Sequence, residues 1–155
     1  TPGTLRAFTT RRGIPVLLYE ASEALRFDET AIRIGVQGVR NVMAALGMVP
    51  TRGRAPPTPA VAVSSSWVRA VRSGVLREPV ALGAAVRKGM PLGMIGDPMG
   101  GDPQPVTAPV AGVVIGRTVL PLVHEGDAVF HIARMDEAEA LTVTARMQRE
   151  RVRNR

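Results

Sequence analysis

The residue best placed for acid–base chemistry in this sequence is Glu20, which directly follows the apolar run Ile14–Tyr19. A nearly uninterrupted apolar run of this kind is typical of a strand that is covered on both faces, as in parallel α/β sheets. Functional groups of open α/β sheets gather at the carboxyl ends of the strands, which is where Glu20 would lie. The residues alone nevertheless favour an ion-paired carboxylate at a strand end over a catalytic acid.

The other chemistry-bearing residues form no second reactive cluster. The chain has no cysteine, which excludes disulfides, thiolate zinc sites and cysteine nucleophiles. Its two histidines, His124 and His131, are spaced so that an alternating strand would place them on opposite faces. Because a metal site needs three or four converging groups, structural or surface roles are favoured for both. Lys88, the only lysine, is expected to be a solvated charge in a turn.

Two helices are predicted, one on either side of the apolar run. The first has Thr1 as its cap and Pro2 at the first helical position, and it stops at Gly13. The second is capped by Asp28 and extends to Gly47. Its apolar residues recur at helical spacing: Ile32, Val36, Val39, Val42, Met43 and Leu46.

A strand buried on both faces needs neighbouring strands, because its backbone N–H and C=O groups must be paired. No strand signal precedes Ile14–Tyr19. We therefore expect residues 1–49 to be the C-terminal piece of an α/β domain whose first part is not in this chain. Residues 50–60 are rich in proline, glycine and arginine and are predicted to form a stiff, extended linker.

Residues 61–134 contain an internal repeat that predicts a β domain. Short valine-rich runs are broken there by glycine and proline. Such a repeat implies two similar sheets that face each other. The repeated positions are Ala70 with Ala108, Gly74 with Gly112, Val75 with Val113, Val86 with Val123, Gly89 with Gly126, Leu92 with Val129 and Ile95 with Ile132.

This repeat resembles that of the biotinyl/lipoyl and barrel-sandwich domains from about Ala70 to Ile132. The resemblance implies an all-β barrel-sandwich hybrid that follows the α/β piece. In the carrier members of this group, a modified lysine lies on the hairpin between the two halves. That hairpin is the segment 96–103 here, and it contains no lysine. A swinging-arm role is therefore not expected, and it would require modification at Lys88.

Residues 135–155 are expected to form a basic C-terminal tail that is at least partly helical. Acidic residues come first, from Asp136 to Glu139, and arginines follow, which suits the dipole of a helix. A frayed surface helix is favoured over an RNA-binding or partner-binding tail, because charge runs are usually solvated faces.

The composition argues against several classes of function. The net charge is +7, but the basic residues are scattered, and one Trp, one Tyr and three Phe offer few rings on which bases could stack. Nucleic acid is therefore a weak alternative partner. No apolar run reaches the ~18 residues that a bilayer requires, so no membrane insertion is expected, and the cytoplasm is the default location.

Four segments together suggest a family: 13–20 (GIPVLLYE), 23–29 (EALRFDE), 108–116 (APVAGVVIG) and 123–127 (VHEGD). The combination of the two halves resembles the succinylglutamate desuccinylase/aspartoacylase family of zinc-dependent deacylases, which are relatives of the metallocarboxypeptidases. The resemblance covers most of the chain. The sequence departs from the family at Ser22, where we expect glycine after Glu-Ala.

The resemblance implies that Glu20 is the catalytic acid/base. It would take a proton from a zinc-bound water that attacks an amide carbonyl, and pass that proton to the leaving amine. The zinc ligands, two histidines and a glutamate, would lie upstream of Thr1, so zinc is expected in the intact enzyme and no metal ligand in this chain. Arg26 and Glu23 would line the substrate entrance, with Arg26 pairing to a carboxylate. A loop ion pair between them is an equally good interpretation.

The leading prediction is therefore the C-terminal part of a zinc-dependent hydrolase that cleaves an amide bond of an N-acyl amino acid or a related small molecule. Without its N-terminal catalytic segment the chain is expected to be inactive. The alternative is a non-catalytic β-barrel module for binding or assembly, in which residues 1–47 complete the sheet of a partner. A homo-oligomer is compatible with both interpretations.

Overall fold

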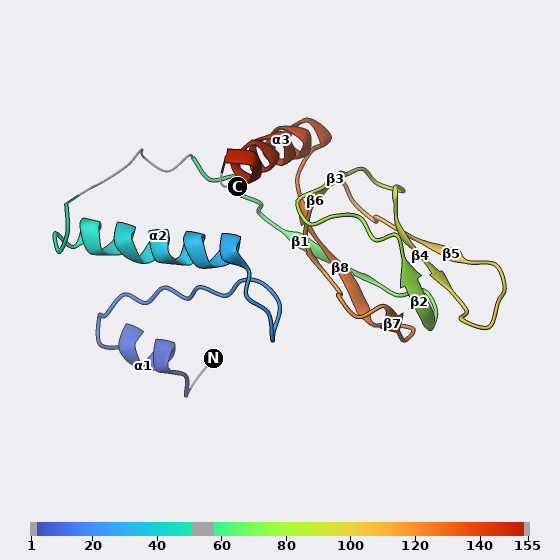
Figure 1. Ribbon diagram of the computed structural model, residues 1–155, viewed down its shortest axis with the longest axis horizontal. Coiled ribbons are helices and arrows are strands. Elements are labelled where there is room, and N and C mark those ends of the chain that lie inside the picture. Colours follow the sequence, from blue (N-terminus) through green and yellow to red (C-terminus); the bar gives the residue numbers. More distant parts are fainter. Residues whose placement is uncertain (1–2, 51–57, 154–155) are drawn as a thin grey trace. The chain divides into compact units, whose positions relative to one another are not determined.

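Two units make up the chain in this computed structural model, which describes residues 3–50 and 58–153. They are Thr1–Pro56 and Pro57–Arg155, and Figure 1 shows the elements of each. Most of the predicted linker, residues 51–57, lies outside the described residues. Within the described ranges, no helix combines the length and the apolarity that crossing a bilayer requires.

The first helix is shorter than predicted. α1 (Leu5–Thr10) is capped by Thr4, whose side chain accepts a hydrogen bond from the N–H of Ala7. The predicted start at Thr1 and Pro2 lies outside the described residues. The helix therefore owes its observed beginning to a second threonine that can act as a cap.

The second helix lies where its capping residue predicts it. α2 (Glu29–Ala45) is capped by Asp28, whose carboxylate accepts hydrogen bonds from the N–H groups of Thr30 and Ala31 at 2.9 and 3.0 Å. Gly47 follows with a φ of 71°, a left-handed conformation that ends helices and favours glycine.

The segment Ile14–Tyr19 is not a β-strand in this chain, and that prediction is wrong for the chain by itself. A β-strand forms only when a neighbouring strand pairs with its backbone. This segment forms no ladder with any described residue, so it is extended but is not a strand. Its side chains are correspondingly exposed, with Leu17 at 83% and Leu18 at 62%. One anchor holds it to α2, since the hydroxyl of Tyr19 donates to the carbonyl of Ala31 at 2.8 Å. No described residue of this unit is buried.

The second unit contains two four-stranded antiparallel sheets. Sheet A has the order β1 (Ser65–Arg69), β8 (Ala128–Arg134), β6 (Gly112–Arg117) and β3 (Ala85–Val86). Sheet B has the order β5 (Gln104–Thr107), β4 (Pro91–Gly96), β2 (Gly74–Arg77) and β7 (Leu122–Val123). The prediction of an all-β unit with two similar sheets is therefore confirmed, and no ladder joins the two sheets within the described residues.

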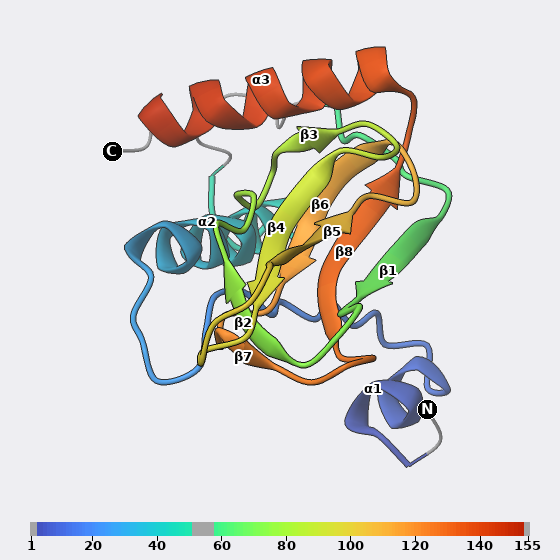
Figure 2. The same cartoon turned by 90° about the vertical axis from the view of Figure 1, so that its right-hand side faces the viewer.

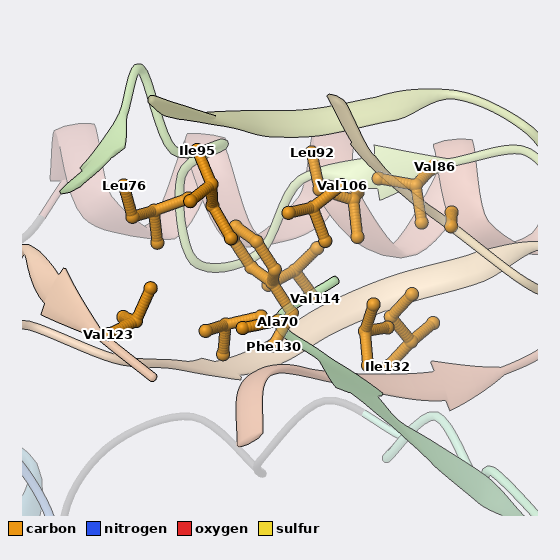
Figure 3. Close-up of a cluster of buried hydrophobic side chains, with 13 residues drawn as sticks. Ala70, Leu76, Val86, Leu92, Ile95, Val106, Val114, Val123, Phe130 and Ile132 are labelled. Carbon is orange, nitrogen blue, oxygen red and sulfur yellow. The ribbon is translucent and has the colours of Figure 1, made fainter. Parts of the chain in front are cut away.

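The internal repeat is confirmed by the burial of equivalent side chains. Ile95 and Ile132, one in each sheet, are both completely buried. Figure 3 shows them in one cluster with Phe130, which is also completely buried although it is not part of the repeat. The two halves of the repeat therefore contribute equivalent faces to a single core, as facing sheets require.

The C-terminal helix is docked rather than frayed, which corrects the prediction for the tail. α3 (Glu137–Arg153) lies against β3 and β6, as Figure 2 shows. Ala140 is 1% exposed, and the hydroxyl of Thr144 donates to the carbonyl of Gly83 at 2.8 Å. Buried Val113 and Ala133 lie outside the main cluster, so this helix covers a second, smaller apolar patch on sheet A.

Candidate functional site

The candidate acid/base, Glu20, is the last residue before the loop that leads to α2. It is exposed, and within the described residues its carboxylate makes no hydrogen bond or ion pair. The ion-paired carboxylate that the residues alone favoured is therefore not what the described part of the chain forms. An exposed carboxylate without a partner remains able to bind a proton or a polar group.

The loop after Glu20 turns sharply at two residues that are not glycine. Ser22 has a φ of 72° and Leu25 a φ of 62°, both in the left-handed region. This conformation costs a residue with a side chain about 1–2 kcal/mol. Ser22 occupies the position where the family resemblance leads us to expect glycine, and its backbone has the conformation that glycine adopts most readily. Serine in place of the expected glycine therefore still allows the turn to form.

Glu23 and Arg26 form an ion pair at the start of this loop. The Nε atom of Arg26 lies 3.5 Å from an Oε atom of Glu23, and the two side chains are 74% and 42% exposed. Exposed pairs of this kind contribute about 0–1 kcal/mol, so a stronger ligand could displace Glu23 from Arg26. The structure brings these two residues together, and Glu20 precedes them in the same connection between the extended segment and α2.

Sequence reasoning missed two apolar side chains in the same loop. Leu25 is 105% exposed and Phe27 is 94% exposed, one on each side of Arg26. The signal in the sequence that could have indicated them is the presence of two large apolar residues in a loop, on either side of a charged one. Two large apolar side chains and a guanidinium are therefore exposed in the loop that follows Glu20 in sequence.

A zinc site does not fit the described residues. No group of three or more His, Cys, Asp or Glu among them converges to hold a metal ion. His124 is exposed in the turn after β7, and its backbone N–H donates to Asp127. His131 lies on β8, where its ring stacks on Trp67 at 4.0 Å between centroids and its Nε2 is 2.8 Å from Ser65 Oγ.

A concave region lies in the β unit, at the hairpin between β4 and β5. This cavity of about 470 Å³ is lined by three charged residues, Arg77, Glu78 and Asp97, together with Met94, glycines and prolines of the hairpin. Lys88 lies elsewhere, exposed in the turn between β3 and β4. The cavity therefore contains no amine that could be modified.

No protein-family model and no curated protein matches this sequence. Solved structures do match. The product-bound ectoine utilization protein EutE (DoeB) from Ruegeria pomeroyi has 25% identity and a TM-score of 0.59, and the match covers 71% of this chain and 35% of that one. A succinylglutamate desuccinylase/aspartoacylase from Rhodobacter sphaeroides has 26% identity and a TM-score of 0.56, with 69% and 36% covered.

The structural neighbours with TM-scores of 0.56 to 0.59 are succinylglutamate desuccinylase/aspartoacylase family members. A succinylglutamate desuccinylase from a Silicibacter species also matches, with a TM-score of 0.59 over 72% of this chain and 35% of its own, but at 20% identity it shows the fold alone. This chain spans about a third of the length of these proteins. Its fold therefore corresponds to part of a deacylase fold.

Proposed function

We propose that this chain is the C-terminal portion of a zinc-dependent hydrolase that cleaves an amide bond of an N-acyl amino acid or a related small molecule. The observation that carries the proposal is the structural match to part of succinylglutamate desuccinylase/aspartoacylase enzymes, with 25% and 26% identity in two of them. The sequence segments 13–20 and 23–29 support it independently, because they surround Glu20 and resemble the same family.

In this proposal Glu20 is the general acid/base. An unpaired carboxylate can accept the proton of a water that attacks the amide carbonyl and then donate it to the leaving amine, so that neither step releases an unstable ion. Within the described residues the carboxylate of Glu20 is exposed and makes no hydrogen bond or ion pair, so it has the freedom that such a proton transfer needs. The described residues do not make a zinc site, so zinc enters the proposal only with ligands from an additional N-terminal segment.

Arg26 and Glu23 are proposed to line the entrance to the site. The guanidinium of Arg26 suits a substrate carboxylate, because the planar fork of an arginine pairs with both oxygens. Glu23 would hold Arg26 in place until a substrate arrives, which agrees with their exposed ion pair at 3.5 Å. The neighbouring side chains of Leu25 and Phe27 would cover the apolar part of a bound molecule.

The proposal extends to the type of fold that the β unit has. We interpret its two sheets and their internal repeat as a barrel-sandwich hybrid of the biotinyl/lipoyl type, appended to the catalytic domain. Equivalent buried positions in the two halves, such as Ile95 and Ile132, support this interpretation. The proposed location is the cytoplasm, and a homo-oligomer remains part of the proposal.

The test is expression of the reading frame that includes any segment upstream of Thr1, followed by assay on a panel of N-acyl amino acids. We expect zinc-dependent release of the amine, and a loss of about 10²–10⁴-fold in kcat for Glu20→Gln. Glu29→Gln, a nearby carboxylate in the first turn of α2, is the matched control and should retain activity. Full activity in Glu20→Gln, or turnover by the 155-residue chain alone, would contradict the proposal.

A second candidate is a non-catalytic module for binding or assembly. It is favoured by one observation, that the β unit has its own buried core while no described residue of the first unit is buried. In this case the longer polypeptide would show no hydrolysis, and Glu20→Gln would leave its binding behaviour unchanged.

A further inference from the structure

One edge of sheet A is open, and its strand is β1. β1 is the terminal strand in the order of the sheet and pairs only with β8 within the described residues. The N–H of Arg134 donates to the carbonyl of Ser64 at 2.9 Å, which makes Ser64 and Arg134 a hydrogen-bonded pair of the ladder. Such pairs alternate along an antiparallel ladder, so the backbone groups of Ser65 and Trp67 point away from β8. They face the open edge.

The side chain of Trp67 adds a flat apolar surface to this edge. Trp67 lies directly opposite His131, and the two rings stack at 4.0 Å with an angle of 9° between them. Since β8 is the only described strand that pairs with β1, the indole face opposite to His131 is turned toward the unpaired edge, and Trp67 is 58% exposed. A side chain on an added strand would lie against that indole face.

β1 has only some of the devices that usually protect an edge, namely a bulge and the charge of Arg69 at its end. Proline, lysine and inward-pointing charges prevent unwanted pairing in natural sheets, and none is present in Ser65–Arg69. The bulge between Val68 and Arg69 limits regular pairing to the first part of the strand. β5 of the facing sheet approaches β1 but forms no ladder with it.

The charges around the edge indicate which partner it suits. Arg69 lies at one end of β1, and Arg134 lies beside Ser64 at the other end, both exposed. One nitrogen of the Arg69 guanidinium donates to the carbonyl of Gly126 at 2.6 Å, which leaves its other N–H groups for a ligand. Of the two carboxylates that flank Gly126 in sequence, Asp127 accepts a hydrogen bond from the N–H of His124, and Glu125 forms no ion pair with Arg69. The whole chain carries a net charge of +7, which disfavours a second copy of itself.

We propose that the β1 edge binds an extended acidic peptide by β-strand addition. The peptide's backbone pairs with Ser65 and Trp67, one of its side chains covers the indole of Trp67, and carboxylates at its two ends lie near Arg69 and Arg134. Backbone pairing supplies affinity, and the tryptophan and the arginines supply selectivity, as in other complexes of this type. This site is independent of Glu20 and of the proposed hydrolysis.

Trp67 is the only tryptophan, so its fluorescence reports directly on this edge. The experiment titrates the full 155-residue chain with the capped peptide Glu-Val-Thr-Val-Glu. We expect a saturable change in emission, weakened by added salt because exposed charges are screened. The same peptide with lysine in place of glutamate should bind at least about tenfold more weakly, since its charges are reversed.

A matched pair of variants tests the backbone contact. Ser65→Pro removes an N–H that points to the open edge, which edge strands tolerate, and should weaken the peptide about tenfold. Ser65→Ala loses the same hydroxyl but keeps the N–H, and should bind like the unchanged protein. Arg134→Gln should weaken binding several-fold, whereas Arg149→Gln on α3 should not. Urea unfolding of each variant verifies that it is folded.

Three outcomes would overturn the proposal. The first is no fluorescence change at millimolar peptide, and the second is equal binding of the acidic and basic peptides or of Ser65→Pro and Ser65→Ala. The third is a dimer in analytical ultracentrifugation that excludes the peptide and is lost in Ser65→Pro, because the edge would then be occupied by a second copy of the chain.

Discussion

The β unit should be strongly destabilised by a single methyl group at Gly112. This residue begins β6 with a φ of 154°, and a Cβ atom added to it would overlap the backbone carbonyl of Ala133 on the paired strand β8. Neither group can move alone, since the register places Gly112 and Val113 against Arg134 and Ala133 in the ladder. Gly112→Ala therefore forces two strands apart or distorts both.

The magnitude follows from two contributions. A residue with a side chain in this sparsely populated backbone region costs about 1–3 kcal/mol, and overpacking against a fixed backbone costs typically 1–3 kcal/mol. Together they lower the free energy of unfolding by about 3 kcal/mol, which is a large part of the stability of a small domain. For a unit of this size, that corresponds to a fall in Tm of roughly 12–24 °C.

Two control variants separate these contributions. Gly89 also has a positive φ, of 81°, but an added Cβ atom would meet nothing within 4 Å, so Gly89→Ala measures the cost of a positive φ without a steric overlap. Gly96 has no such φ, and the nearest neighbour of an added Cβ atom would be Pro103 at 3.6 Å, so Gly96→Ala should be almost neutral. Urea unfolding followed by Trp67 emission gives all three values, because Trp67 lies in this unit. If Gly112→Ala is no less stable than Gly89→Ala, the steric argument is refuted.

Three further substitutions test other contacts. Thr144→Val should lower stability by about 1 kcal/mol and increase hydrogen exchange in α3, because the hydroxyl loses its bond to Gly83; Thr142→Val, whose hydroxyl bonds only within the helix, should change both far less. Phe130→Ala should cost about 3–5 kcal/mol in urea unfolding, since this side chain is completely buried. Asp28→Ala should lower the far-UV helical signal of α2 and its stability by about 1 kcal/mol, because the cap is lost.

The β unit could be predicted in detail because its signals repeat. Ile95 and Ile132, matched by sequence alone, are both completely buried in the structure. The closure of the sheets could not be predicted, because it depends on whether the edge strands β1 and β5 form a ladder, and no local pattern reports that. The contact of α3 was hidden as well, since a small residue such as Ala140 gives no apolar stripe that would indicate a buried face.

The candidate site was predictable only where its contacts are local. The ion pair between Glu23 and Arg26 joins two loop residues that are three positions apart in sequence. The sequence predicted either this ion pair or a role for both residues at the substrate entrance. The stack of Trp67 on His131 joins two strands from opposite ends of the β unit, so it depends on a register that only the structure reveals. The predicted strand Ile14–Tyr19 failed for the converse reason, because its pattern describes a strand with neighbours, and the described residues provide none.

The two units therefore differ in what determines their geometry. The β unit is fixed by a core of completely buried side chains, and a change in its surroundings should leave its sheets intact. Glu20 follows a segment that forms no ladder with any described strand. Its described anchors are the hydrogen bond from the Tyr19 hydroxyl to the Ala31 carbonyl and that from the Ile14 N–H to the Thr9 carbonyl. Backbone pairing of Ile14–Tyr19 with additional strands would fix the direction of the segment and the position of the carboxylate at its end. The proton transfer proposed for Glu20 thus requires a sheet that the described residues do not form by themselves.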